Sequence, residues 1–111
     1  MDDKTKRIAA LNDLLRTTFN PAAGRVVVTR GIQALHPDDR TQIFSLVKTF
    51  NAFTPDNDPY GEHDFGAVEH NGNKAFWKID YYAPDMMHGR EDPSDPAQTV
   101  RVMTIMLANE Y

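Results

Sequence analysis

Apolar side chains recur at helical spacing in two stretches of the chain. Within residues 3–19, and again within 37–53, they fall three or four positions apart, and polar side chains occupy most of the positions between them. This spacing predicts an amphipathic helix in each stretch, with one apolar face directed at a core. The apolar positions are Ile8, Leu11, Leu14, Leu15 and Phe19 in the first helix, and Ile43, Leu46, Val47, Phe50 and Phe53 in the second.

The residues that flank these stretches support the predicted boundaries. Asn20-Pro21 ends the first helix, because proline cannot continue a helix and disfavours helical backbone in the residue before it. Pro37 suits a first helical turn, and the two acids that follow it favour the positive end of the helix dipole. We expect the second helix to end before Pro55.

Two further stretches favour extended structure. Three successive valines within 25–29 predict a strand, since β-branched side chains are stiff at χ1. Residues 64–82 predict a β-hairpin, because Asn71-Gly72 is a preferred pair for a two-residue type I′ turn. The register that this turn sets places Trp77 over Gly66, where glycine leaves room for the ring. The face expected to join the core carries Gly66, Val68, Ala75, Trp77, Ile79 and Tyr81.

The end of the chain completes the predicted fold. Residues 83–98 form an acidic loop that contains prolines, and 100–107 suits either a third strand or a buried helix. The β-branched residues of 100–107 favour the strand. Together these elements predict a single α+β domain of 111 residues, in which two helices pack on one face of a small, mainly antiparallel sheet.

Composition and charge narrow the classes of function. The absence of cysteine excludes disulfides, thiol nucleophiles and thiolate metal ligands. A net charge of −4 argues against direct nucleic-acid binding, which usually needs a basic face, and favours a partner protein with a basic surface. No apolar run approaches the roughly 20 residues of a membrane span, and the charged N-terminus lacks the apolar core of a signal peptide. We therefore expect a cytoplasmic protein that does not enter a membrane.

The loop at 54–63 concentrates groups that could carry chemistry. Its two prolines and its glycine predict a loop of fixed conformation. The run from Asp56 to Gly61 resembles the start of a calcium-binding loop, but the third oxygen ligand and the bidentate glutamate of such loops are both missing. The aspartates could instead bond to backbone amides in an Asx-type turn. The residues of a possible irregular divalent-metal site are Asp56, Asp58, Glu62 and His63, and no other cofactor is expected.

His63 is the candidate general base. The predicted hairpin register places it opposite Asp80, on a face shared with Lys78 and Tyr82. A histidine oriented by a carboxylate is the base half of many acid–base sites, and Glu62 could act as a second acid. The alternative is a cross-strand ion pair that contributes up to about 1 kcal/mol of stability. No serine occupies a nucleophile elbow, so a Ser-His-Asp hydrolase is poorly supported.

Three stretches resemble a known family. They are FTPDNDPYGEHDFG at 53–66, FWKIDYY at 76–82 and RVMTIMLANEY at 101–111, and the similarity extends back to RIAALN at 7–12. They are similar to a small bacterial family catalogued as domain of unknown function 3768. The resemblance implies a compact bacterial domain that is often encoded on plasmids and other mobile DNA. It implies no activity and no site residues.

Two hypotheses of function follow from the sequence. The first is a non-catalytic interaction or modulator protein, because the chain is small and acidic and has no complete catalytic motif; the association with mobile DNA would fit a regulatory or anti-defence role. The second is a small enzyme or divalent-metal-binding protein that uses the 54–64 loop. In the second, His63 acts as base, Asp80 orients it, and Glu62 is a second acid or a metal ligand.

Overall fold

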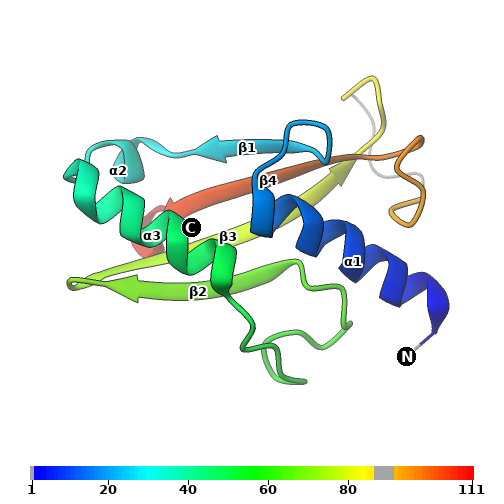
Figure 1. Ribbon diagram of the computed structural model, residues 1–111, viewed down its shortest axis with the longest axis horizontal. Helices are drawn as coiled ribbons and strands as arrows, with labels where there is room; N and C mark the ends of the chain where they lie inside the picture. Colours follow the sequence, from blue (N-terminus) through cyan, green and yellow to red (C-terminus); the bar gives the residue numbers. More distant parts are fainter. Residues whose placement is uncertain (1, 87–91) are drawn as a thin grey trace.

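The computed structural model describes residues 2–86 and 92–111 (Figure 1). Four strands form one sheet in the order β1-β4-β3-β2, in which β1 runs parallel to β4 and the other neighbours are antiparallel. The predicted α+β class is therefore confirmed. The elements are α1 (Asp3–Thr18), β1 (Arg25–Val28), α2 (Arg30–Gln33), α3 (Pro37–Thr49), β2 (Phe65–His70), β3 (Asn73–Tyr82), β4 (Val100–Leu107) and the 3-10 turn η1 (Ala108–Glu110).

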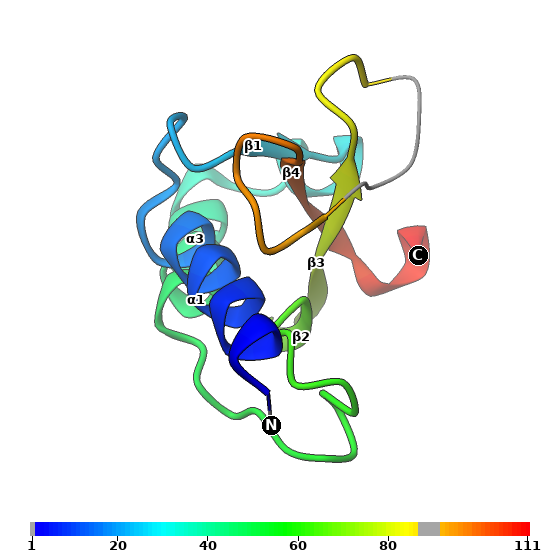
Figure 2. The same ribbon diagram turned by 90° about the vertical axis from the view of Figure 1, so that its right-hand side faces the viewer.

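The molecule has two layers. In Figure 2, α1 and α3 lie on one side of the sheet and the C-terminal turn lies on the other, as expected for two helices that cover one face. The core forms between these layers. Leu15 of α1, Ile43 of α3, Trp77 of β3 and Ile105 of β4 are all fully buried there. Side chains alternate along each strand, so every second residue of the sheet points away from the helices.

Helix α1 begins and ends close to its predicted limits. The carboxylate of Asp2 accepts a hydrogen bond from the Thr5 amide at 2.7 Å, which is the usual role of an aspartate at a helix start. Phe19 has left-handed backbone, with φ of 55°, and its amide donates to the Leu15 carbonyl at 2.8 Å. The predicted apolar face needs one correction, because Leu14 is 49% exposed.

Helix α3 is shorter than its apolar spacing predicts. It ends at Thr49 and not at residue 53, and Phe50 leaves the helix with ψ of 130°. The guanidinium group of Arg16 donates from Nη1 to the carbonyls of Val47 and Lys48, at 3.0 and 3.3 Å. These carbonyls would otherwise accept amides of the next helical turn. The predicted end at 53 is therefore wrong, because a side chain from α1 helps to end α3.

The hairpin forms with the predicted register. Asn71 and Gly72 have φ of 53° and 80°, as a type I′ turn requires. Gly66 pairs with Trp77, and a Cβ added at Gly66 would lie 2.5 Å from the indole Nε1. Only glycine leaves room for this ring, so the sequence signal at Gly66 was sound. Ala75, Trp77 and Ile79 belong to the core, and Val68 and Tyr81 pack against it.

The last strand settles the choice between strand and helix. Residues 100–107 form β4, which pairs with both β1 and β3. Strand β1 ends one residue earlier than predicted, because Thr29 is the N-cap residue of α2, a single helical turn that the sequence did not predict. The Glu110 carboxylate accepts the Thr29 hydroxyl at 2.6 Å and the Gly31 amide at 2.9 Å. The C-terminal turn therefore holds α2 in place.

The face of the sheet opposite the helices carries an aromatic cluster. The rings of Phe65, Phe76 and Tyr111 have centroids 5.3 to 6.0 Å apart.

Residues 83–86 and 92–98 belong to the predicted acidic loop, whereas 87–91 lie outside the described residues. Within the described ranges, no helix has both the length and the apolar content that crossing a membrane would require.

Candidate functional site

A pocket of about 550 Å³ lies where the 54–63 loop meets the start of α1. Figure 2 shows the N-terminal end of α1 directly above this loop. Aromatic and proline rings form part of the wall, and Asp58 and His63 supply ionisable groups. We call this space the acidic pocket. It is lined by Asp2, Thr5, residues 53–55, residues 58–61 and His63.

Asp58 is the buried acid of the acidic pocket. Its amide donates to the Thr54 carbonyl at 2.8 Å, and its side chain is 5% exposed. Among the described residues, its carboxylate accepts only the His63 amide, at 3.2 and 3.4 Å, and no lysine or arginine lies within 4.0 Å. A buried carboxylate without a fixed cation costs stability. Asp58 therefore holds the backbone amide of His63, as the backbone-bonding alternative expected, while its charge has no lysine or arginine beside it among the described residues.

His63 is held against α1 through its ring. The ring stacks on Phe53 with a centroid distance of 3.8 Å and an interplanar angle of 2°. Its Nδ1 lies 3.0 and 3.1 Å from the two oxygens of Asp13, which also accepts Nη2 of Arg16 at 3.0 Å. An ionised carboxylate only accepts, so this contact assigns the proton to Nδ1. In the neutral ring this leaves Nε2 as an acceptor, 3.7 Å from Oδ2 of Asp58, whereas in the protonated ring Nε2 carries a second proton and the two groups form an ion pair.

The predicted pairing of His63 with Asp80 is wrong. The β2–β3 ladder ends at the Phe65–Lys78 pair, and His63 has left-handed backbone with φ of 56°, so the chain turns before a pair with residue 80 could form. Asp80 belongs to the strand face that points away from the helices, where it pairs with Lys78 at 3.0 Å. Asp13 of α1 takes the orienting position that the hairpin register had assigned to Asp80.

The predicted metal ligands are brought together only in part. Asp58 and His63 share the acidic pocket, whereas Asp56 is exposed and Glu62 directs its carboxylate to Tyr81. Within 2–86 and 92–111, no group of three or more His, Asp or Glu side chains has the arrangement of a metal site. Metal binding by Asp56, Asp58, Glu62 and His63 stays a prediction. The structure places two of these candidate metal ligands, Asp58 and His63, next to each other.

A second group of polar side chains begins at Glu62, the residue before His63, and its members bond to one another. Fully buried Asn12 donates from Nδ2 to the Glu62 carbonyl at 2.9 Å and to the Tyr81 hydroxyl at 2.7 Å. The Tyr81 hydroxyl donates to Oε1 of Glu62 at 2.9 Å, and Nε of Arg101 donates to Oδ1 of Asn12 at 2.7 Å. We call these four residues the Asn12 network. It joins α1, the end of the loop, β3 and β4.

Burial shifts the proton equilibria in and beside the Asn12 network. Desolvation, with a smaller contribution from the Glu62 carboxylate, raises the pKa of Tyr81 well above its usual range. Desolvation lowers the pKa of Arg101, which remains a cation. Beside the network, burial followed by the charge of Glu62 raises the pKa of Asp64. Tyr81 therefore acts as a neutral hydrogen-bond donor.

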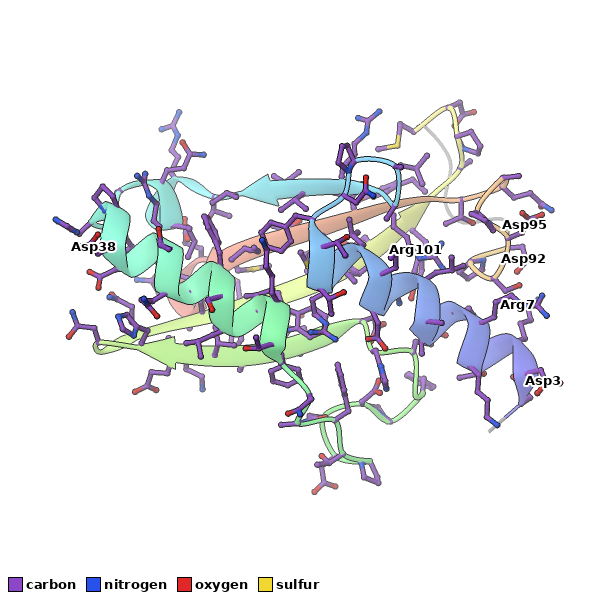
Figure 3. The ribbon with its side chains drawn as sticks, viewed as in Figure 1. Asp3, Arg7, Asp38, Asp92, Asp95 and Arg101 are labelled. Atoms are coloured by element: carbon purple, nitrogen blue, oxygen red, sulfur yellow. The ribbon has the colours of Figure 1, made fainter. Side chains whose placement is uncertain are left out.

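Arg101 also reaches the loop that precedes β4. Figure 3 shows it beside α1, on the side of the helix nearer the loop that carries Asp92 and Asp95. Its Nη2 donates to the Pro93 carbonyl, and Lys4 of α1 pairs with Asp92 at 3.5 Å. The guanidinium group also lies 5.4 Å from the centre of the Tyr81 ring. Arg101 therefore anchors that loop and has no exposed face for a ligand, since it is only 3% exposed.

Sequence reasoning missed the residues that organise this region. The apolar spacing of the first helix predicts that its polar residues, Asn12 and Arg16 among them, lie mostly away from the core, yet these two are 0% and 3% exposed. They lie four and eight positions after Ile8, and this spacing places them on its buried side. The polar side chains at core-facing positions were the available signal. Asp13 had no signal of its own, because its partner His63 lies 50 residues away.

The comparisons with known proteins identify a family and no activity. The family model described as "Protein of unknown function (DUF3768)" matches residues 28–110, which is more than half of the chain. No curated protein and no solved structure shows significant similarity to the chain. The match confirms the resemblance found in the sequence. This chain therefore belongs to the family of proteins of unknown function designated DUF3768.

Proposed function

We propose that this chain is a non-catalytic interaction protein, which modulates another macromolecule by binding a partner protein with a basic surface. The observation that supports this proposal is Asp58 in the acidic pocket. It is a nearly buried carboxylate at a concave surface, with no lysine or arginine of the described chain beside it. A cation brought by a partner would pair with it and remove the cost of the unpaired charge.

The surroundings of the acidic pocket favour the same partner. Asp2 lines the pocket and is exposed, and the exposed Asp3 and Asp56 are each next in the chain to a residue that lines it. Together with the net charge of −4, they would attract a basic surface over several ångströms and speed the encounter. A cytoplasmic location and a regulatory or anti-defence role belong to the same proposal. The location rests on the charged N-terminus and the absence of cysteine, and the role on the association with mobile DNA that the family resemblance implies.

The experiment that tests the proposal is affinity capture from a bacterial lysate with the immobilised chain. Wild-type protein is compared with Asp58→Asn and with the matched control Asp38→Asn, which makes the same change at the far end of α3 (Figure 3). We expect wild type and Asp38→Asn to retain the same protein and Asp58→Asn to lose it. Raising the salt concentration should weaken the retention, because salt screens charge pairs.

Two results would count against the interaction proposal. One is that wild type and Asp58→Asn retain the same proteins from the lysate. The other is a retained protein whose binding surface is acidic, since the acidic pocket would repel it.

A second candidate function rests on a different observation. Asp13 orients His63 through Nδ1 at 3.0 Å and leaves Nε2 on the pocket side, next to Asp58. A histidine held in this way can accept a proton from a bound substrate or water. His63 would then be a general base, Asp13 its orienting partner and Asp58 the second acid.

The hypothesis that the chain is an enzyme is tested by measuring rates of substrate turnover. Purified protein is offered esters, phosphate esters and glycosides, alone and with magnesium, manganese, zinc or calcium, and wild type is compared with His63→Gln. Loss of a general base should slow turnover by roughly a hundredfold or more. If His63→Gln and wild type show the same rate on every substrate, His63 is not a catalytic base for these reactions.

A further inference from the structure

When the His63 ring is neutral, two hydrogen-bond acceptors converge on the acidic pocket with no donor between them. Nε2 of His63 and Oδ2 of Asp58 are 3.7 Å apart, which is too long for a hydrogen bond. The contact with Asp13 assigns the His63 proton to Nδ1, so Nε2 presents a lone pair. Both oxygens of Asp58 accept the same His63 amide at long distances, so they retain lone pairs for another donor.

We propose that the acidic pocket binds the guanidinium group of an arginine side chain from the partner protein. This inference rests on the proposed function and names the group that would enter its site. One edge of the planar guanidinium group donates to Asp58, and a further N–H donates to Nε2 of His63. The bound cation thereby supplies the counter-charge and the missing donor together.

The shape of the pocket favours guanidinium over ammonium. A guanidinium group is planar and has five N–H donors in a fixed fork, whereas an ammonium is a compact and strongly hydrated point charge. Two acceptors 3.7 Å apart match neighbouring donors of one fork. The ring of Tyr60 also lines the pocket and is 79% exposed, so its face can stack on the guanidinium plane.

The proposal is tested by titrating 15N-labelled full-length protein with methylguanidinium chloride and, separately, with methylammonium chloride at constant ionic strength. The amides of Gly61 and His63 report on the pocket, and the amide of Gly72 in the hairpin turn is the remote control. We expect saturable shifts at Gly61 and His63 with methylguanidinium, with a Kd on the order of millimolar for so small a ligand. Methylammonium should bind several-fold more weakly.

Two variants with matched controls locate the binding. Asp58→Asn should raise the Kd for methylguanidinium roughly tenfold, whereas Asp38→Asn should leave it unchanged. Tyr60→Ala removes an exposed side chain, so the fold is kept, and it should raise the Kd about threefold. Tyr111→Ala is its control, because Tyr111 is 74% exposed and lies on the opposite face of the sheet.

Several results would overturn the guanidinium site. They are the absence of saturable shifts at Gly61 and His63, equal binding of both cations, or an unchanged Kd in both Asp58→Asn and Tyr60→Ala. Zinc that saturates the same amides while methylguanidinium does not would replace the proposal with a metal site. If the titration fails while lysate capture still depends on Asp58, the guanidinium inference falls and the interaction proposal stands. The reverse outcome keeps the guanidinium site and removes the protein partner.

Discussion

The Asn12 network and the acidic pocket are two polar regions at the same end of the molecule. They differ in how far their polar atoms are hydrogen-bonded to protein groups. In the Asn12 network, the buried amide of Asn12 uses both its donor and its acceptor on protein groups. In the acidic pocket, the Asp58 carboxylate has one amide as its donor, and Nε2 of His63 faces it as a second acceptor. The first region is closed, and the second is open to a cavity.

This difference distinguishes buried polar groups that stabilise the fold from buried polar groups that bind a ligand. A buried polar network whose members are all satisfied holds elements in one arrangement, and the Asn12 network joins two strands to a helix and a loop. A buried carboxylate beside a pocket, without a fixed cation, lowers stability and gains only when a cation arrives. We therefore expect substitutions in the two regions to have opposite effects on folding and binding.

The largest loss of stability is expected for Asn12→Ala. The substitution removes the hydrogen bonds that Asn12 makes to Nε of Arg101 and to the Glu62 carbonyl in a buried site, and the Tyr81 hydroxyl keeps only its bond to Glu62. Each of the two lost bonds costs about 1–3 kcal/mol when its group stays buried, so the free energy of unfolding should fall by at least about 2 kcal/mol. Urea unfolding measures this loss, and Asn109→Ala at an exposed site is the control. A loss below about 1 kcal/mol would mean that the network is not what holds these elements.

A smaller loss is expected for Tyr81→Phe. Removing the hydroxyl leaves Oε1 of Glu62 and one donor of Asn12 to be satisfied by others, at a cost of about 1–3 kcal/mol. Tyr82→Phe, on the opposite face of β3, should change stability by less than about 0.5 kcal/mol. Equal losses in the two variants would contradict a special role for the Tyr81 hydroxyl.

Tyr81 also predicts how stability depends on alkaline pH. Its pKa is raised in the folded state, so above the unfolded pKa of about 10 the folded chain holds a proton that the unfolded chain releases. Stability should therefore fall as pH rises beyond about 10, and the fall should be shallower in Tyr81→Phe. Unfolding free energies measured across this range test the sign.

The sequence predicted local elements better than it predicted the site. The Asn71-Gly72 turn and the space at Gly66 for Trp77 are local or neighbouring signals, and the structure confirms both. The end of α3 was predicted wrongly because Arg16, far along the chain, donates to its last carbonyls. A pattern of apolar positions carries no information about such a contact.

The candidate site was likewise predicted only as far as local sequence signals allowed. The loop was recognised from its residues, and the structure does bring Asp58 and His63 together. The partner of His63 was assigned by extending the hairpin ladder, but a left-handed residue ends the regular geometry at that point. Asp13 could not be identified, because pairing between a helix and a distant loop depends on how the two layers pack.

A small gain in stability is expected for Asp64→Asn. Burial and the Glu62 charge raise the pKa of Asp64 in the folded state, so the folded chain binds this proton more tightly than the unfolded chain does. Stability contributed by the protonated group is present at low pH and is lost as pH rises through the folded pKa. The variant should therefore melt slightly higher than wild type at pH 7 and no higher at pH 3. A lower melting temperature at pH 7 would contradict this sign.

The free energy of unfolding of Asp58→Asn at neutral pH tests most directly whether the acidic pocket is kept for binding. Asparagine retains an oxygen that can accept the His63 amide, and it removes the buried charge that lacks a lysine or arginine partner in the described chain. We predict an unchanged value or a gain of up to about 1 kcal/mol, in the same protein preparation that no longer binds methylguanidinium. A loss of about 2 kcal/mol or more would contradict this prediction, because Asp58 would then stabilise the fold as Asn12 does.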